Sequence, residues 1–158
     1  MNMEKIIALC GSEPEGKFYK DTLSSEFQVE IYFTAKEAQG ALSDPTVAVA
    51  IANCGLDRID GIGFLKEALR IDPTIVRIAF SEQQEFKIAA SVVNEAHVHN
   101  YLCGELDSSQ LKSAIEAGLR SRSKEKAVDS IIETLRKEKD QLDETTLEIL
   151  ETLKNNKK

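Results

Sequence analysis

Short apolar segments alternate with segments of helical spacing along most of the chain. The apolar segments predict five strands, near Lys5–Cys10, Gln28–Phe33, Val47–Asn53, Ile75–Phe80 and Val98–Cys103. The segments between them predict helices near Glu15–Leu23, Ala35–Leu42, Gly61–Arg70, Glu82–Asn94 and from Asp107 onward. This alternation predicts an α/β fold, with a doubly wound, five-stranded parallel sheet and a long C-terminal helix.

Two local features support these assignments. The segment Val47–Asn53 is apolar up to its last residue, which is typical of a strand buried on both faces of a parallel sheet. Thr34 with Glu37, and Ser81 with Gln84, have the spacing of a capping box. We therefore expect Thr34 and Ser81 to cap the second and fourth helices.

The last helical pattern continues to the end of the chain without Pro and, after Gly118, without Gly. Its apolar positions form a heptad seam of six residues: Val128, Ile132, Leu135, Leu142, Ile149 and Leu153. Lys139 and Thr146 interrupt one row of this seam. Because a lone helix is marginal in water, we expect residues 122–158 to form a homodimeric coiled coil. Packing of this tail back onto residues 1–121 is the alternative.

The length of 158 residues fits one domain, residues 1–121, plus the helical extension. The net charge of −7 lies in the first part, which has 11 Lys and Arg against 18 Asp and Glu, while residues 122–158 have nine of each. An acidic body argues against a nucleic-acid partner. No apolar run approaches the ~20 residues that cross a membrane, so we expect no membrane association and a cytoplasmic protein.

The three cysteines, Cys10, Cys54 and Cys103, have no paired spacing, so we predict reduced thiols and neither a metal site nor a cofactor. No Ser-His-Asp or Cys-His arrangement is evident, and we predict no enzyme. The segment Gly11–Lys17 matches a phosphate-binding loop in form. However, Phe18 stands where a Mg²⁺-binding hydroxyl is needed, and the acidic residues within the segment would repel phosphate.

The segment VAVAIANCGLDRIDGIGFLKEAL, residues 47–69, resembles the receiver domain of bacterial two-component response regulators. In that family a strand ends in the phosphorylated Asp, and Asp-Gly and a helix follow. Asn53 stands at the position of that Asp, and an amide cannot act as the nucleophile. Cys10 and Gly11 stand where the family has two acidic residues that bind Mg²⁺.

Three further positions extend the resemblance over residues 5–119. Ser81 matches the hydroxyl that senses the phosphoryl group, and Tyr101 matches the aromatic switch residue that faces partners. Gly104 and Glu105 stand where the family has Lys and Pro. The resemblance therefore implies a flavodoxin-like pseudo-receiver with a degenerate phosphorylation site, formed by Cys10, Gly11, Asn53, Ser81 and Gly104.

The implied function is a phosphorylation-independent signalling module that binds a protein partner, with a tail that mediates dimerisation or transmits a signal. By the resemblance, the partner would bind the face formed by the fourth helix, the fifth strand and the fifth helix. One alternative is a small-ligand or thiol-redox sensor that uses the neutralised pocket. Another is that the chain is a fragment of a longer regulator with an output domain.

Overall fold

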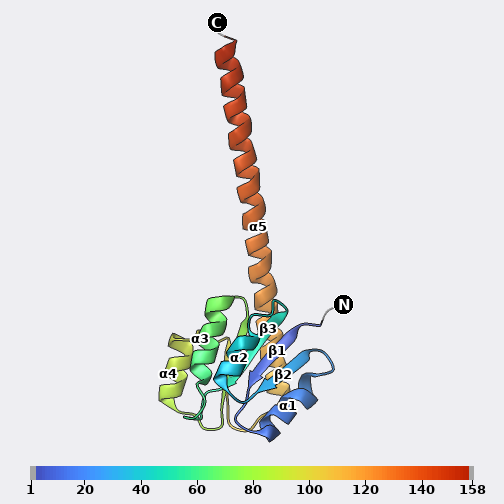
Figure 1. The fold of residues 1–158 in the computed structure, drawn as a ribbon, viewed down its shortest axis with the longest axis vertical. Helices are drawn as coiled ribbons and strands as arrows, with labels where there is room; N and C mark the ends of the chain where they lie inside the picture. Colours follow the sequence, from blue (N-terminus) through green and yellow to red (C-terminus); the bar gives the residue numbers. More distant parts are fainter. Residues whose placement is uncertain (1–2, 157–158) are drawn as a thin grey trace. The chain divides into compact units, whose positions relative to one another are not determined.

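The computed structural model describes residues 3–156, which form five strands and five helices in strict alternation (Figure 1). The strands are β1 (Lys5–Leu9), β2 (Gln28–Tyr32), β3 (Val47–Asn53), β4 (Val76–Ser81) and β5 (Asn100–Cys103). The helices are α1 (Glu13–Leu23), α2 (Ala35–Ala41), α3 (Gly61–Ile71), α4 (Phe86–Asn94) and α5 (Ser108–Asn155).

The strands form one parallel sheet in the order β2-β1-β3-β4-β5. The order reverses direction after the first strand, so the chain winds along both halves of the sheet, as the doubly wound prediction requires. Every residue of β3 is buried, which agrees with its apolar sequence and its central place. The predicted flavodoxin-like fold with a long C-terminal helix is confirmed.

Each face of the sheet carries its own hydrophobic core. Helices α2, α3 and α4 cover one face, where buried residues include Ala38, Leu65, Ala68 and Val92. Helices α1 and α5 cover the other, where buried residues include Tyr19, Leu23, Leu111 and Ile115. The approach of α5 to β4 is close, because a β-carbon at Gly118 would lie 2.3 Å from Val76 Cγ1. Glycine at this position therefore allows α5 to pack on the sheet.

One predicted helix cap is confirmed and the other is wrong. Thr34 Oγ1 accepts a hydrogen bond from the Glu37 backbone N–H at 3.4 Å, as an N-cap does. Ser81 does not cap α4, which begins at Phe86 rather than near residue 82. Ser81 instead ends β4, where it pairs with Cys103 of β5, and its hydroxyl donates to the Gln83 carbonyl at 2.6 Å. The strand pairing keeps Ser81 extended, so the helix starts later.

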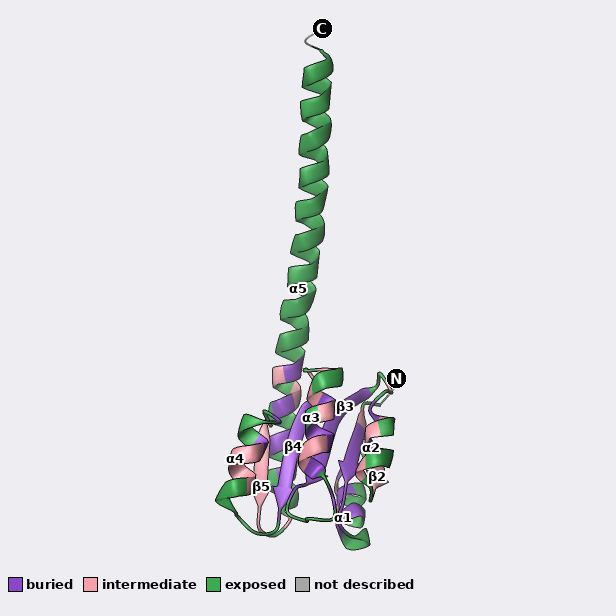
Figure 2. Cartoon of the chain, turned by 60° about the vertical axis from the view of Figure 1, so that its left-hand side comes forward, coloured by how far each residue is buried: buried purple, intermediate pink, exposed green. Residues whose placement is uncertain are grey.

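The chain divides into two compact units, Met1–Arg122 and Ser123–Lys158. Arg122 belongs to the first unit, because its guanidinium is buried and donates to Thr74 Oγ1 at 2.7 Å. The second unit is helical, and each of its described residues, 123–156, is exposed (Figure 2). Within residues 3–156, no helix combines the length and the apolar character that crossing a bilayer requires.

Candidate functional site

Asn53 lies at the carboxyl end of the central strand β3, where parallel α/β sheets gather their functional groups. Its side chain is almost fully buried, with 4% of the residue exposed. Its amide is held from both ends. Asn53 Nδ2 donates to Glu15 Oε1 at 2.8 Å, and Asn53 Oδ1 accepts from the Gly55 N–H at 3.0 Å. The amide is therefore fixed in one orientation.

Glu15 reaches this site because of how helix α1 begins. Ser12 is the N-cap, and its hydroxyl accepts from the Glu15 N–H, which places Glu15 in the first turn. From there the carboxylate folds back over the end of β1, where Glu15 Oε1 also accepts from the Gly11 N–H at 3.1 Å. One carboxylate oxygen thus joins the first loop to the end of β3.

Gly11 leaves the room that this arrangement needs. A β-carbon at Gly11 would lie 2.3 Å from Leu56 Cδ1 and 3.2 Å from Asn53 Nδ2. Arg58 donates a hydrogen bond to the Gly11 carbonyl, which joins the loop after β3 to the loop after β1. A side chain at position 11 would push these two loops apart.

Burial dominates the electrostatics of this cluster. Glu15 is 8% exposed, and burial raises the pKa of its carboxyl, partly offset by the hydrogen bonds from Asn53 and Gly11. Glu15 Oε2 has no hydrogen-bond partner within residues 3–156. Burial, together with the nearby Glu15 carboxylate, also raises the pKa of the Cys10 thiol. Both groups therefore favour their neutral forms more than in water.

Ser81, Gly104 and Tyr101 form a second group on the adjacent strands. The Gly104 N–H donates to the Ser81 carbonyl at 3.0 Å, and Gly104 has a positive φ of 90°. A β-carbon at Gly55 would lie 2.6 Å from Ser81 Oγ, so this group touches the loop that holds Asn53. Tyr101 is half-buried, and burial raises the pKa of its hydroxyl. Its hydroxyl oxygen is itself buried and does not face solvent.

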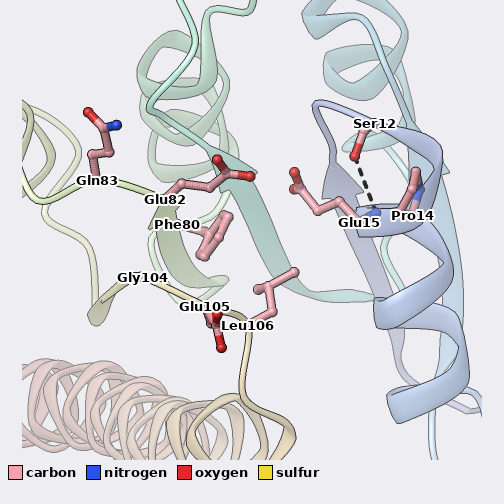
Figure 3. A pocket seen from close by; sticks show the side chains of 9 residues that line it. All are labelled: Ser12, Pro14, Glu15, Phe80, Glu82, Gln83, Gly104, Glu105 and Leu106. Carbon is pink, nitrogen blue, oxygen red and sulfur yellow. Dashed lines mark hydrogen bonds between the residues drawn. The ribbon is translucent and has the colours of Figure 1, made fainter.

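A cavity of about 550 Å³ opens beside these groups (Figure 3). Its lining comes from the start of α1, the end of β4 and the loops after β4 and β5: Ser12, Pro14, Glu15, Phe80, Glu82, Gln83, Gly104, Glu105 and Leu106. In Figure 3 the carboxylates of Glu15 and Glu82 point toward each other, and the charge of Glu82 adds to the raised pKa of Glu15. Of the five predicted site residues, all of them described, only Gly104 lines this cavity. The neutral pocket around Cys10, Asn53, Ser81 and Gly104 stays a prediction, and the cavity beside these residues is acidic, with Glu15, Glu82 and Glu105 in its lining.

The residues at the end of β3 do not fit Mg²⁺, the ion that receiver phosphorylation uses. Magnesium requires hard oxygen ligands in near-octahedral geometry. Here Cys10 and Gly11 bring no carboxylate and Asn53 brings a neutral amide, which leaves Glu15 as the one acid of this cluster, with its Oε1 accepting from Asn53 and Gly11. No group of three or more His, Cys, Asp and Glu side chains within residues 3–156 is arranged to hold a metal.

Sequence reasoning missed Glu15, although it holds the centre of the site. In the sequence, the acidic residues of Gly11–Lys17 argue against a phosphate-binding loop and indicate no further role. The available signal was the acidic residue three positions after Ser12, the spacing of a helix start. That signal places Glu15 in the first turn of α1. It does not tell that the carboxylate reaches Asn53, 38 residues later in the chain.

The fold is that of response regulator receiver domains. No family model matches the chain. A signal receiver domain of an HD domain-containing protein from Pseudomonas fluorescens Pf-5 superposes with a TM-score of 0.73 at 21% identity, covering 80% of this chain and 94% of that one. A CheY-like receiver domain protein from Methanospirillum hungatei JF-1 gives 0.71 at 20% identity, covering 78% and 99%.

Among curated proteins, the chain is similar to the hydrogenase transcriptional regulatory protein HoxA of Cupriavidus necator. The two are 33% identical over 81 residues, which is 51% of this chain and 17% of the regulator. The chain thus spans less than a fifth of that protein's length. The match concerns 81 residues and says nothing about the rest of that regulator.

Proposed function

We propose that this protein is a phosphorylation-independent signalling module: its receiver-like body binds a protein partner, and its tail pairs with a second copy. It works as a binding protein and not as an enzyme. The observation that carries this proposal is the hydrogen bond between Asn53 Nδ2 and Glu15 Oε1. A receiver switch needs a free carboxylate nucleophile beside Mg²⁺ at the end of the central strand. Here an amide bound to an internal carboxylate stands at that place.

The partner-binding part of the proposal rests on the face formed by α4, β5 and the first turns of α5. Phe86 and Val93 of α4 are 89% and 55% exposed, although both are large and apolar. A groove of about 570 Å³ runs between the edge strand β5 and the start of α5, with Tyr101, Leu102 and Ala114 in its lining. An edge strand with exposed apolar neighbours offers a partner both backbone groups and hydrophobic area.

The dimerisation part rests on the tail. Its six seam residues are all exposed in a single chain, at fractions from 41% for Ile132 to 67% for Leu142. A helix of this length with a repeated apolar row gains stability chiefly from a partner helix. The same seam is present in a second copy of the chain. A homodimer can therefore bury the seam residues without another protein. We place the protein in the cytoplasm, since its three cysteines are free.

The thiol-redox alternative has little physical support. Burial raises the pKa of the Cys54 thiol to about 12, and that of Cys10 is raised as well. The reactive species is the thiolate, so both thiols are disfavoured as sensors. A small-ligand sensor keeps one supporting observation, the 550 Å³ cavity. Its acidic lining favours a ligand that carries positive charge.

Mass spectrometry after incubation with acetyl phosphate and Mg²⁺ tests the proposal directly. We expect no mass gain in the full chain, and an unchanged dimer in sedimentation before and after the treatment. An ordinary receiver domain treated in parallel should gain one phosphoryl group and serves as the positive control. A phosphorylated species of this chain, or a dimer that forms only after treatment, would contradict the proposal.

A further inference from the structure

We propose that the two tails pair antiparallel, in the register that places Val128 of one copy opposite Leu153 of the other. This inference rests on the proposed dimerisation and assigns its geometry. The layers of such a coil come from two rows of positions, which contain the six seam residues together with Lys139 and Thr146. The first row contains Ile132, Lys139, Thr146 and Leu153. The second row contains Val128, Leu135, Leu142 and Ile149. All eight side chains are exposed in the single chain.

A parallel pair would bring like charges together. Equivalent positions face each other in a parallel coil, so Lys139 would meet Lys139 of the second copy within the seam. The flanking positions pair five residues apart, which would bring Glu138 against Asp143 of the second copy. Only Lys124 with Asp129 forms an attractive flanking pair in that arrangement. The parallel coil therefore has repulsion at its centre and one attraction at its end.

The antiparallel register removes both repulsions. Each residue of the first row then faces one of the second row, and Lys139 lies opposite Leu142 of the other copy. The aliphatic part of Lys139 can pack on that leucine while its ammonium reaches solvent. The flanking positions now bring Arg136 beside Asp143 of the second copy, and by symmetry this ion pair occurs twice. Glu138 lies opposite Thr145, which carries no charge.

The register follows from overlap of the whole seam. The first and last seam residues are Val128 and Leu153. When Val128 of one copy lies opposite Leu153 of the other, every seam residue has a partner in the second copy. The 26 residues from 128 to 153 span about 39 Å of helix at 1.5 Å per residue. A shift by one heptad would leave two seam layers unpaired at the ends. Maximal burial and opposite charges thus select the same arrangement.

Dipolar distance measurements between spin labels on the full chain test the arrangement. The labels are placed at Ser130→Cys and, as the matched position, Lys137→Cys, which both lie on the outer face of the coil. In the antiparallel register Ser130 lies opposite Glu151, so its two labels are separated by about 32 Å along the axis. Lys137 lies opposite Glu144, so its two labels are separated by about 10 Å along the axis. Both variants carry Cys103→Ser, because Cys103 is the least buried native thiol.

The result expected is a longer distance at Ser130 than at Lys137, with no dipolar signal from the chain that has no added cysteine. Equal distances at the two positions would show a parallel coil, which would overturn this inference while leaving the dimer intact. The absence of any dipolar coupling between labelled chains would overturn both the inference and the proposed dimer.

A charge exchange gives an independent readout. Arg136→Asp should weaken the dimer roughly tenfold, because it sets two carboxylates against each other at both symmetric sites. Combining it with Asp143→Arg restores the pair in reversed order, and the dissociation constant should return close to that of the unchanged chain. In a parallel coil position 136 faces Ile131, so failure of the single change to weaken the dimer would contradict the antiparallel pairing.

Discussion

The body and the tail differ in which of their side chains are buried. In the body, Asn53, Glu15 and Gly11 are buried at the ends of β1 and β3 and are joined by hydrogen bonds through Glu15 Oε1. In the tail, every described residue is exposed, including the apolar seam. A region whose polar groups are internally paired needs no ligand to hold its shape. A helix with an uncovered apolar seam needs a partner. This difference supports the proposal that the site keeps one conformation and that the tail associates.

The largest effect should come from a charge placed in the seam. Ile149→Asp puts a carboxylate opposite the apolar Ile132 of the second copy, so the dimer dissociation constant should rise at least about 100-fold, or roughly 3 kcal/mol. Sedimentation velocity over a concentration series gives this number. Leu147→Asp is the matched control, because Leu147 is exposed to a similar degree, 60% against 55% for Ile149, but lies outside the seam. If both variants weaken the dimer equally, the seam is not the dimer interface.

Asn53→Asp should damage the body without restoring phosphorylation. A carboxylate at position 53 would lie against Glu15 Oε1, where the amide now donates at 2.8 Å. The free energy of unfolding should fall by about 1–3 kcal/mol at pH 7, and by less at pH 4, where one of the two acids is protonated. Urea unfolding at both pH values measures this. We also expect no phosphoryl gain from acetyl phosphate.

The double variant Asn53→Asp with Glu15→Gln is the control for that change. Its glutamine can donate to the new carboxylate, so most of the lost stability should return. If the double variant is no more stable than Asn53→Asp alone, the Glu15–Asn53 contact does not carry the effect.

Glu15→Gln alone should change how stability depends on pH. The pKa of Glu15 is raised in the folded protein from an ordinary value of 4.5, so the folded state binds more protons than the unfolded state just above that pH. Its contribution is fully present below pH 4.5 and is lost as pH rises through the folded pKa. Glutamine keeps an oxygen acceptor for Asn53 and Gly11. We expect a gain of roughly 1 kcal/mol at pH 8 that vanishes near pH 4, measured by denaturant unfolding. A gain independent of pH would contradict the buried carboxylate.

Gly104→Ala should have the smallest effect. Gly104 has a φ of 90°, which strains any residue with a β-carbon, although the space around it is open. We expect a loss of about 1 kcal/mol in unfolding free energy. Gly40→Ala is the control, because Gly40 also has open space but lies in helix α2, where alanine should stabilise by up to about 1 kcal/mol. If the unfolding free energy changes in the same direction in both variants, conformational strain at Gly104 is not the cause.

The features set by local pattern were predictable, and those set by distant contacts were not. The apolar run of β3 and the cap at Thr34 depend on neighbouring residues, so periodicity and spacing located them. Ser81 has the spacing of a cap, but pairing of β4 with β5 keeps it in the strand. Glu15 depends on the fold that brings α1 to the end of β3. Its role follows from the three-dimensional arrangement and has no signature along the chain.

Phosphorylation independence is best tested by sedimentation equilibrium of the full chain with and without acetyl phosphate and Mg²⁺, paired with intact-mass measurement of the same samples. We expect one dimer dissociation constant in both conditions and no phosphorylated species. A phosphoryl adduct accompanied by a shift in that constant would contradict this expectation, since the site would then act as a phosphorylation switch.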